Sequence, residues 1–478
     1  MKKKIPTSVT ASWPGLLLAF MICAAPSGAQ TPDAALREEA LKGLKKAATF
    51  YHDKAASHGG YVYYYSADLQ QRWGEGKADA DTIFVQPPGT PTVGLAYLRA
   101  FAATGDKFYL DAARDTAEAL VHGQLQSGGW TQTIHFAGGQ RVGKYRNGKG
   151  GSWNASSLDD GQTQTALRML MQADRALEFK HAAIHEAAQY GLKALLAAQF
   201  ANGAFPQVWT GPVEKKPVVA AKFPDYDWKT EGRVKNYWDF YTLNDGLAGT
   251  VADVLLAAQE IYKDAGSKAA VARLGDFLIL AQMPEPQPGW CQQYNYEMVP
   301  IWARKFEPPA ITGWESQDAM ETLIKIFRHT GDKKYLEPIP RALVYYKKCL
   351  LPDGRIARYH EFKTNQPLYM DARYQLTYDD SAAPSHYGWK QNARFDAIEK
   401  AYQDAKAGRT PVPPHRASEK DVRKILGELD AEGRWISTYA GEGLVGQPKF
   451  SDGFRYISSD VFSRNVEALS ESVASGRK

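Results

Sequence analysis

Two short acidic segments carry the side chains whose chemistry stands out first. Asp159 and Asp160 are adjacent, and Asp245 follows an asparagine in a similar context about one repeat later. Each segment precedes an apolar run of helical character, and one aspartate is enough to cap such a helix. Two adjacent aspartates exceed that need. The additional carboxylate can hold a hard cation such as Ca²⁺, which prefers carboxylate and carbonyl oxygens and accepts water.

Basic side chains gather further along the chain. Arg304 and Lys305 lie between aromatic residues and precede two adjacent prolines, and Arg358 and Arg373 lie among tyrosines. Guanidinium groups bind carboxylates through two parallel hydrogen bonds. Acids and arginines in one protein therefore fit an anionic polymer that a cation bridges to the protein carboxylates. The simpler alternative for Arg304 is a surface arginine beside a proline turn.

The elements that position these residues recur along the chain. Four apolar runs of helical character each begin after a turn rich in Gly or Pro, at residues 87–98, 158–170, 243–256 and 312–323. They start roughly 70 to 85 residues apart, which is longer than the usual solenoid period of about 20–50 residues and suits a pair of helices with a long loop. We predict an all-α-dominated (α/α) barrel, a closed toroid of helical hairpins, with the first helix of each pair inside and the acids at its mouth.

Other segments support this architecture. Residues 104–110 and 330–336 repeat a Thr-Gly-Asp-Lys pattern in which Gly ends one helix and Asp caps the next. A first helix is expected over residues 33–50 and a late one over 419–429. The long segments 61–88 and 201–241 are expected to be loops that wall a groove. The last third reads as an irregular, partly stranded face, with a separate small domain as the alternative.

A third repeat passes from Gln through Gly or Pro to an aromatic residue. It occupies residues 124–130, 199–209 and 282–293, with a degenerate copy at 353–355. We expect turns that join neighbouring units, with Gln bonded to the backbone and the aromatic ring buried. The alternative is that some rings are platforms for sugars.

Composition limits the function classes. The chain has 478 residues, 44% hydrophobic and 23% charged, which is typical of a globular protein. Residues 1–29 carry three lysines, a short apolar run and small residues, and we predict that they form a signal peptide. We expect residues 30–478 to form a single catalytic domain in a secreted or periplasmic protein. A lipid anchor on Cys23 is the alternative. Removal of this segment lowers the formal charge from +5 to +2, which does not favour nucleic acid, and the apolar run is too short to span a membrane.

Several familiar motifs are absent. The sequence has no Cys and His at zinc spacing, no Gly-rich phosphate loop and no Gly-x-Ser-x-Gly elbow. After the signal segment two cysteines remain, Cys291 and Cys349, which allow one disulfide or two buried thiols.

Five motifs together resemble the family ten polysaccharide lyases, the pectate lyases with an (α/α)₃ barrel. The motifs are Leu158-Asp159-Asp160-Gly161-Gln162-Thr163, Leu243-Asn244-Asp245-Gly246, Gly289-Trp290-Cys291-Gln292-Gln293, Ala303-Arg304-Lys305-Phe306-Glu307-Pro308-Pro309-Ala310 and Ala357-Arg358-Tyr359-His360-Glu361-Phe362. The likeness extends over about residues 35 to 470. Its most specific part is the close succession of the third and fourth motifs.

The resemblance implies calcium-assisted anti β-elimination on polygalacturonate by a protein that we expect to be monomeric. Asp159 matches the acid that would hold Ca²⁺, whereas Asp160 stands where related enzymes have Asn, so its part is less defined. Asp160 and Asp245 are assigned to substrate or ion contacts. Arg304 matches the position of the base. A list of further substrate contacts comprises Lys305, Arg358 and Arg373.

Two other functions remain open. The same toroid could be a non-catalytic protein that binds acidic polysaccharides, or a glycoside hydrolase. Hydrolysis needs a carboxylic acid and a base on either side of the scissile bond, for which Asp159 and Glu315 are the candidates. An arginine base requires its pKa to fall by about 3 units from above about 12, which predicts an alkaline optimum.

Overall fold

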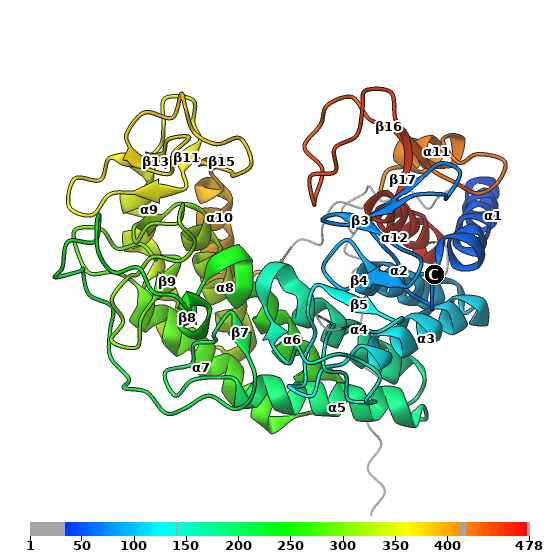
Figure 1. Cartoon of the computed structure of the whole chain (residues 1–478), viewed down its shortest axis with the longest axis horizontal. Helices are drawn as coiled ribbons and strands as arrows, with labels where there is room; N and C mark the ends of the chain where they lie inside the picture. The colour runs from blue at the N-terminus through cyan, green and yellow to red at the C-terminus, as the bar shows by residue number, and fades with distance from the viewer. Residues whose placement is uncertain (1–33, 140–141, 412–416, 476–478) are drawn as a thin grey trace, which may run out of the picture.

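The computed structural model describes residues 34–139, 142–411 and 417–475. Twelve α-helices form its main layer, and most of them come as hairpins (Figure 1). The first helix of each hairpin is α2 (Thr90–Thr104), α4 (Gln162–Ala176), α6 (Leu247–Tyr262) or α8 (Trp314–Thr330). The second is α3 (Lys107–His122), α5 (Ala182–Ala197), α7 (Ala265–Ala281) or α9 (Ile339–Lys347). All four helical runs expected from the sequence are therefore present.

Successive hairpins pack side by side in chain order. Helix α2 packs against α4, α4 against α6 and α6 against α8, while α3 contacts α5 and α5 contacts α7 on the outside. The remaining helices complete the two ends: α1 (Ala34–Phe50), α10 (Phe395–Lys406), α11 (Glu419–Gly427) and α12 (Ser459–Ser475). Helix α12 packs on α1 and α2, and α10 packs on α8 and α9. The predicted helical toroid is confirmed.

The toroid is not closed, however. Figure 1 shows an arc whose two ends, at α10 and at α11 with α12, face each other across an opening. Helix α11 contacts α1 and α12, whereas α10 contacts the opposite end of the arc. The expectation of a closed ring is therefore wrong. The physical reason is that α1 and α2 already cover the apolar face of α12, so packing against α10 is not required to bury that face.

Local sequence explains how the hairpins turn. Gly105 and Gly331 end α2 and α8 with φ of 75°, a left-handed conformation that glycine adopts without strain. Asp106 then accepts a hydrogen bond from the backbone N–H of Phe108 and opens α3. Asp332 does the same for Lys334, but it opens a short 3₁₀ turn before α9. Both repeated turns work as the sequence predicts.

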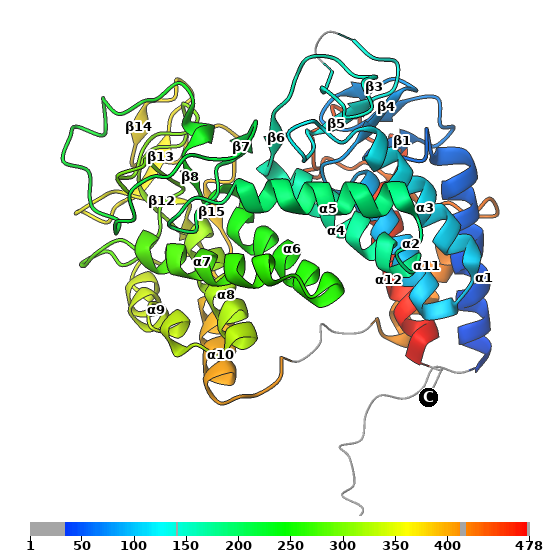
Figure 2. The same cartoon turned by 90° about the horizontal axis from the view of Figure 1, so that it is seen from below.

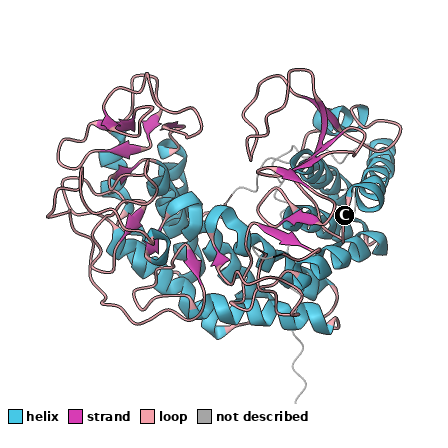
Figure 3. Cartoon of the chain, in the orientation of Figure 1, coloured by secondary structure: helices cyan, strands magenta, loops and turns pink. Residues whose placement is uncertain are grey.

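A strand lies before the first helix of every hairpin and pairs antiparallel with a strand that comes after the second helix. The pairs are β4 (Thr82–Phe84) with β5 (Thr133–His135), β6 (Ser156–Ser157) with β7 (Val208–Trp209), β8 (Tyr241–Thr242) with β9 (Gln293–Tyr294), and β10 (Ile311–Thr312) with β12 (Tyr359–His360). Figure 3 shows the strands in the connecting loops. In Figure 2 they gather at one end of the helical layer. This end carries the openings of the inner helices.

Longer sheets wall the two ends of the arc. One has the order β16-β17-β1-β2-β3, in which β1 (Tyr64–Ser66) pairs with β17 (Arg455–Ser458), and its other strands are β2 (Arg72–Trp73), β3 (Lys77–Ala78) and β16 (Ile436–Thr438). At the other end, β10 and β12 continue into β13 (Pro367–Met370) and β14 (Leu376–Thr377), and β11 (Ile356–Ala357) pairs with β15 (Lys390–Gln391). The segment 61–88, expected as an irregular loop, thus contains four short strands.

The Gln repeats join neighbouring hairpins, as the first interpretation of the sequence predicts. In each, the side-chain amide donates to a carbonyl in its own turn and to another in the next outer hairpin. The acceptors are Gly128 and Ala187 for Gln124, Gly203 and Ala270 for Gln199, and Pro288 and Pro338 for Gln282, at 2.9–3.1 Å. Trp130 and Trp290 are fully buried. They fill the core, so they are not sugar platforms.

Candidate metal and anion site

Two equivalent corners position the acidic side chains. Asp160 and Asp245 each follow a short strand, β6 or β8, and each adopts a positive φ, 45° and 52° respectively. Gly161 and Gly246 come next with φ of 73° and 66°, and an inner helix begins. Since aspartate tolerates the left-handed region better than most residues, this corner is accessible to the sequence. Because the two units are neighbours, both carboxylates reach the same place.

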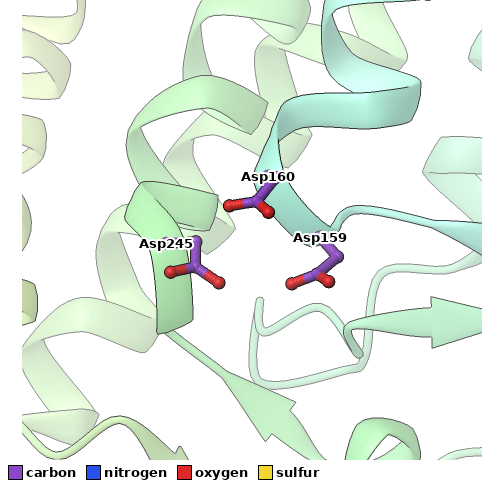
Figure 4. A group of neighbouring side chains, drawn as sticks. All are labelled: Asp159, Asp160 and Asp245. Atoms are coloured by element: carbon purple, nitrogen blue, oxygen red, sulfur yellow. The ribbon is translucent and has the colours of Figure 1, made fainter. Parts of the chain in front are cut away.

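Asp159 completes a cluster with these two residues. One oxygen from each of Asp159, Asp160 and Asp245 lies within 4.8 Å of the others (Figure 4). Figure 4 shows the three side chains pointing toward a common space between the openings of α4 and α6. The three acids that the sequence singled out are therefore brought together by the fold.

Amide side chains hold the cluster from the other side. Gln207 donates to Asp159 Oδ1 at 2.5 Å. Gln86 donates at 3.1 Å to Asp160 Oδ2 and at 2.8 Å to Glu75 Oε1, so a fourth carboxylate lies just behind the cluster. These contacts orient the oxygens and leave the negative charges in place.

The concentration of negative charge changes how the cluster titrates. The Asp160 side chain is exposed, but the protein around its carboxyl group partly excludes water, and this desolvation together with the charges of Asp159 and Glu75 raises its pKa to about 6. Burial and the charges of Asp160 and Asp159 raise the pKa of Asp245 well above its ordinary value. Arg304 and Arg358 oppose both rises in pKa, so their guanidinium charges act on the cluster but do not neutralise it.

A divalent cation would fit this donor set. Oxygens bound to one Ca²⁺ lie about 2.3–2.6 Å from it and hence up to about 5 Å from each other. The carboxylate oxygens satisfy that spacing. They are hard ligands whose mutual repulsion a dication would remove. Asp159, Asp160 and Asp245 are thus the residues that could hold calcium.

The guanidinium group of Arg304 is fixed by Glu307. Its Nε and Nη2 donate to Glu307 Oε2 and Oε1 at 2.8 and 2.6 Å, and its backbone N–H donates to Glu307 Oε2 at 2.9 Å. Burial by itself would lower the pKa of Arg304, but the Glu307 carboxylate outweighs it and raises that pKa above its usual value. In the ligand-free protein, Arg304 is therefore a held cation.

Arg358 is the buried guanidinium of the site. Its Nη2 donates to Glu315 Oε1 at 2.8 Å and lies 3.9 Å from Asp245 Oδ1. Its carbon Cζ lies 4.5 Å from the centroid of the Tyr387 ring. Glu315 is 1% exposed. Because Glu315 is enclosed and paired, it is not placed to act as the acid of a glycoside hydrolase.

Two of the residues expected to bind substrate lie apart from the cluster in their described contacts. Lys305 is exposed, and its Nζ lies 3.7 Å from the centroid of the Tyr374 ring. Arg373 is exposed in the turn between β13 and β14, where its backbone N–H donates to Asp371. The charges of Arg304 and Arg358 thus act on the cluster of Asp159, Asp160 and Asp245, whereas the described contacts of Lys305 and Arg373 are with Tyr374 and Asp371.

Sequence reasoning gave no role to several residues of the site. Glu307 follows Arg304 at a spacing that suits an ion pair, so this partner could have been found. Tyr387 donates to Glu307 Oε1 at 2.9 Å and links it to Tyr359. Nothing in the local sequence pairs Gln86 or Gln207 with the acids, because Gln86 comes from the preceding hairpin and Gln207 from the other end of the same hairpin, after α5. The two cysteines are free and buried, so they do not form a disulfide.

Comparison with known proteins finds a family model that matches the part of the chain carrying the cluster. Residues 136–325 match the family model described as pectic acid lyase. The match supports a lyase. It agrees with the resemblance to pectate lyases that the motifs indicated. The matched segment includes Asp159, Asp160, Asp245 and Arg304, and it ends before Arg358. No curated protein sequence matches the chain.

Solved structures similar to this chain include two of a family 10 polysaccharide lyase from Cellvibrio cellulosa. The first is 18% identical, covers 64% of this chain and 95% of its own, and has a TM-score of 0.46. The second, a mutant in complex with trigalacturonic acid, is 18% identical, with 66% and 98% covered and a TM-score of 0.46. A cellobiose 2-epimerase from Spirochaeta thermophila is 13% identical, with 92% and 96% covered and a TM-score of 0.46. Among the described residues, no helix combines the length and apolar character needed to cross a membrane.

Proposed function

We propose that this protein is a pectate lyase that cleaves polygalacturonate by calcium-assisted anti β-elimination. The observation that carries the proposal is the cluster of three aspartates on which the charges of Arg304 and Arg358 act, with the aspartates and Arg304 in the segment that matches the pectic acid lyase model. Carboxylates alone would repel a polyuronate. Guanidinium groups alone would bind it without a cation, so the combination is what the proposed chemistry needs.

The bond changes assign a task to each group. The C5 proton of the uronate is removed, its electron pair forms the C4–C5 double bond, and the C4–O bond breaks. Calcium bound at Asp159, Asp160 and Asp245 would withdraw charge from the uronate carboxylate and so acidify C5. Arg358 would bind the same carboxylate, and Arg304 would take the C5 proton. The oxygen that leaves takes a proton from water or from a tyrosine.

The base assignment has a clear electrostatic condition. Arg304 begins with a raised pKa because of Glu307, and only its neutral form can accept a proton. A dication bound at the aspartate cluster lowers the pKa of a nearby guanidinium through charge repulsion. Calcium would therefore oppose the effect of Glu307. The neutral fraction of Arg304 still rises with pH, so we propose an alkaline optimum. An optimum below pH 6 would assign the proton to another group.

The test is the formation of the unsaturated product. Polygalacturonate incubated with the protein should give an ultraviolet absorbance that a calcium chelator abolishes. Arg304→Ala should lose turnover and still bind oligogalacturonate, while Arg464→Ala, which changes an exposed arginine on α12, should match the wild type. A fully active Arg304→Ala variant would refute the base assignment. Cleavage without unsaturation would indicate hydrolysis.

A protein that binds acidic polysaccharides without cleaving them is the second candidate. The ion pair between Arg304 and Glu307 favours it, because a paired guanidinium binds carboxylates but does not take protons. Calcium-dependent binding of oligogalacturonate with no product at any pH would support this candidate.

Export is also part of the proposal. The signal peptide over residues 1–29 lies outside the described residues. If the protein is secreted or periplasmic, expression in its host should give an extracytoplasmic product that begins near Gln30, as mass spectrometry would show. A cytoplasmic product that retains residues 1–29 would contradict this part.

A further inference from the structure

An exposed tryptophan lies beside a polar cavity next to the aspartate cluster. Trp153 is 59% exposed, a value that only Val344 equals among the exposed large hydrophobic residues of the described chain. It lines a cavity of about 500 Å³ together with Thr131, Gln132, Thr133, His135, Gly143 and Ser152. This volume is within the range of about 300–1,000 Å³ typical of small-molecule sites.

The backbone around Trp153 is held in place. Its N–H donates to the carbonyl of Val142 at 3.2 Å, and its own carbonyl accepts from Lys144 at 2.6 Å. The next residue, Asn154, accepts through Oδ1 from the N–H of Ser127 at 2.7 Å. A large apolar ring kept in water on a fixed backbone loses little conformational entropy when it meets a ligand. An indole face of this kind suits the apolar face of a sugar ring.

Hydrogen bonds connect this cavity to the acids. Gln132, which lines the cavity, donates to Gln86 Oε1 at 3.1 Å. Gln86 in turn donates to Asp160 Oδ2 at 3.1 Å. Two hydrogen bonds through Gln86 therefore link the cavity wall to the cluster, which favours a polymer whose reacting unit is at Asp160 and another unit here.

The chemistry of the lining suits an anionic sugar. None of the residues that line the cavity is an aspartate or a glutamate, in contrast to the neighbouring cluster. Hydroxyl, amide and imidazole groups surround the ring of Trp153. A uronate unit would meet hydrogen-bonding groups and an aromatic face without a repelling carboxylate.

We propose that Trp153 and this cavity form a substrate subsite that binds a non-reacting galacturonosyl unit of the polymer. The inference rests on the proposed function, since it takes the polymer to be polygalacturonate. The subsite contributes to the grip on long chains and does not touch the reacting carbon. Its contribution should therefore grow with substrate length.

The experiment compares Trp153→Ala, Trp153→Phe and the wild type on polygalacturonate and on trigalacturonate. Trp153→Ala should raise KM for the polymer about tenfold, which corresponds to about 1.4 kcal/mol, and the loss should be smaller for the trimer. Trp153→Phe should recover most of the affinity. Phe179→Ala serves as the matched control, because Phe179 is also exposed, at 44%, but lies after α4 at the far end of that helix. It should match the wild type.

Calorimetric binding of the same ligands with calcium separates this inference from the proposed function. If the wild type forms no unsaturated product but binds the polymer more tightly than Trp153→Ala does, the lyase proposal fails and the subsite stands. If the wild type cleaves the polymer and Trp153→Ala is within twofold of it, the subsite is refuted. Equal losses on both substrates would also refute it, as would a wild type that does not bind polygalacturonate.

Discussion

Replacing Asp160 with asparagine should have opposite effects on calcium binding and on stability. The substitution keeps the size and one oxygen of the side chain and removes one negative charge from the cluster. Because the Asp160 side chain is open to solvent, we use the dielectric constant of water. A dication at about 2.4 Å then loses about 3 kcal/mol of attraction, so the Kd for calcium should rise roughly 100-fold.

The same change relieves repulsion when calcium is absent. Two unit charges 4.8 Å apart, the upper limit for the oxygens of the cluster, repel by about 0.9 kcal/mol in water, and Asp160 has two such neighbours. The calcium-free Asp160→Asn variant should therefore gain between 1 and 2 kcal/mol, or about 2 °C in Tm. Asp452→Asn, which changes an exposed aspartate in a loop before β17, should alter neither quantity.

The pH dependence follows from the raised pKa of Asp160, about 6. The folded protein holds this proton more tightly than the unfolded chain does, so the charge of Asp160 costs stability as the pH rises from about 4 to 6. Below about pH 6 the proton also competes with calcium. The wild-type Kd for calcium should rise steeply with falling pH. Because Asp160→Asn removes one titrating carboxyl group, the Kd of the variant should rise less steeply.

The assays are calorimetric titration with calcium between pH 5 and 9 and thermal unfolding with a chelator present. Unchanged calcium affinity in Asp160→Asn would place the ion elsewhere. A lower Tm of the calcium-free variant would show that Asp160 stabilises the turn before α4 through local hydrogen bonds. It would contradict the expected repulsion between Asp160 and the other two aspartates.

Two further substitutions test how the site and the hairpins are held. Glu315→Gln removes the nearest charged partner of the buried Arg358 guanidinium and leaves only Asp245 at 3.9 Å, so it should cost about 3 kcal/mol in urea unfolding; exposed Glu38→Gln on α1 is the control, and a cost below about 1 kcal/mol would contradict the buried ion pair. Gln199→Ala removes two donated hydrogen bonds and leaves Arg273 without its acceptor, so a loss of about 2–4 kcal/mol is expected. A neutral Gln199→Ala would mean that the turns do not depend on these bonds.

The inner helices and the acids could be predicted because their signals are local. A turn, a polar opening and an apolar period are contained within about 15 residues, so the starts of α4 and α6 and the place of Asp160 and Asp245 follow from the sequence. The Gly-Asp turns before α3 and α9 are of the same kind. Because this pattern recurs along the chain, the sequence also predicts that the starts of the inner helices gather at one end.

The remaining features depend on contacts that are distant in sequence. The strand pairs that frame each hairpin are two or three residues long and have no readable period. The opening of the arc depends on which neighbour covers α12. At the site, Gln86 bonds to Asp160 across 74 positions of sequence and Gln207 to Asp159 across 48, and the ion pair of Arg358 with Glu315 joins residues 43 positions apart. Such pairings require the three-dimensional structure.

The pairing of β1 with β17 also governs the order of assembly. Tyr64 lies opposite Ser458, and the hydroxyl of Tyr51 bonds to that of Ser459 at 2.9 Å, so one of the first strands to emerge during synthesis waits for one of the last. Contacts of such long sequence separation form late and slow folding. A chain cut short before residue 455 would leave the edge of β1 unpaired and open to aggregation. The sheet at this end of the arc is thus complete only after the last strands have been synthesised.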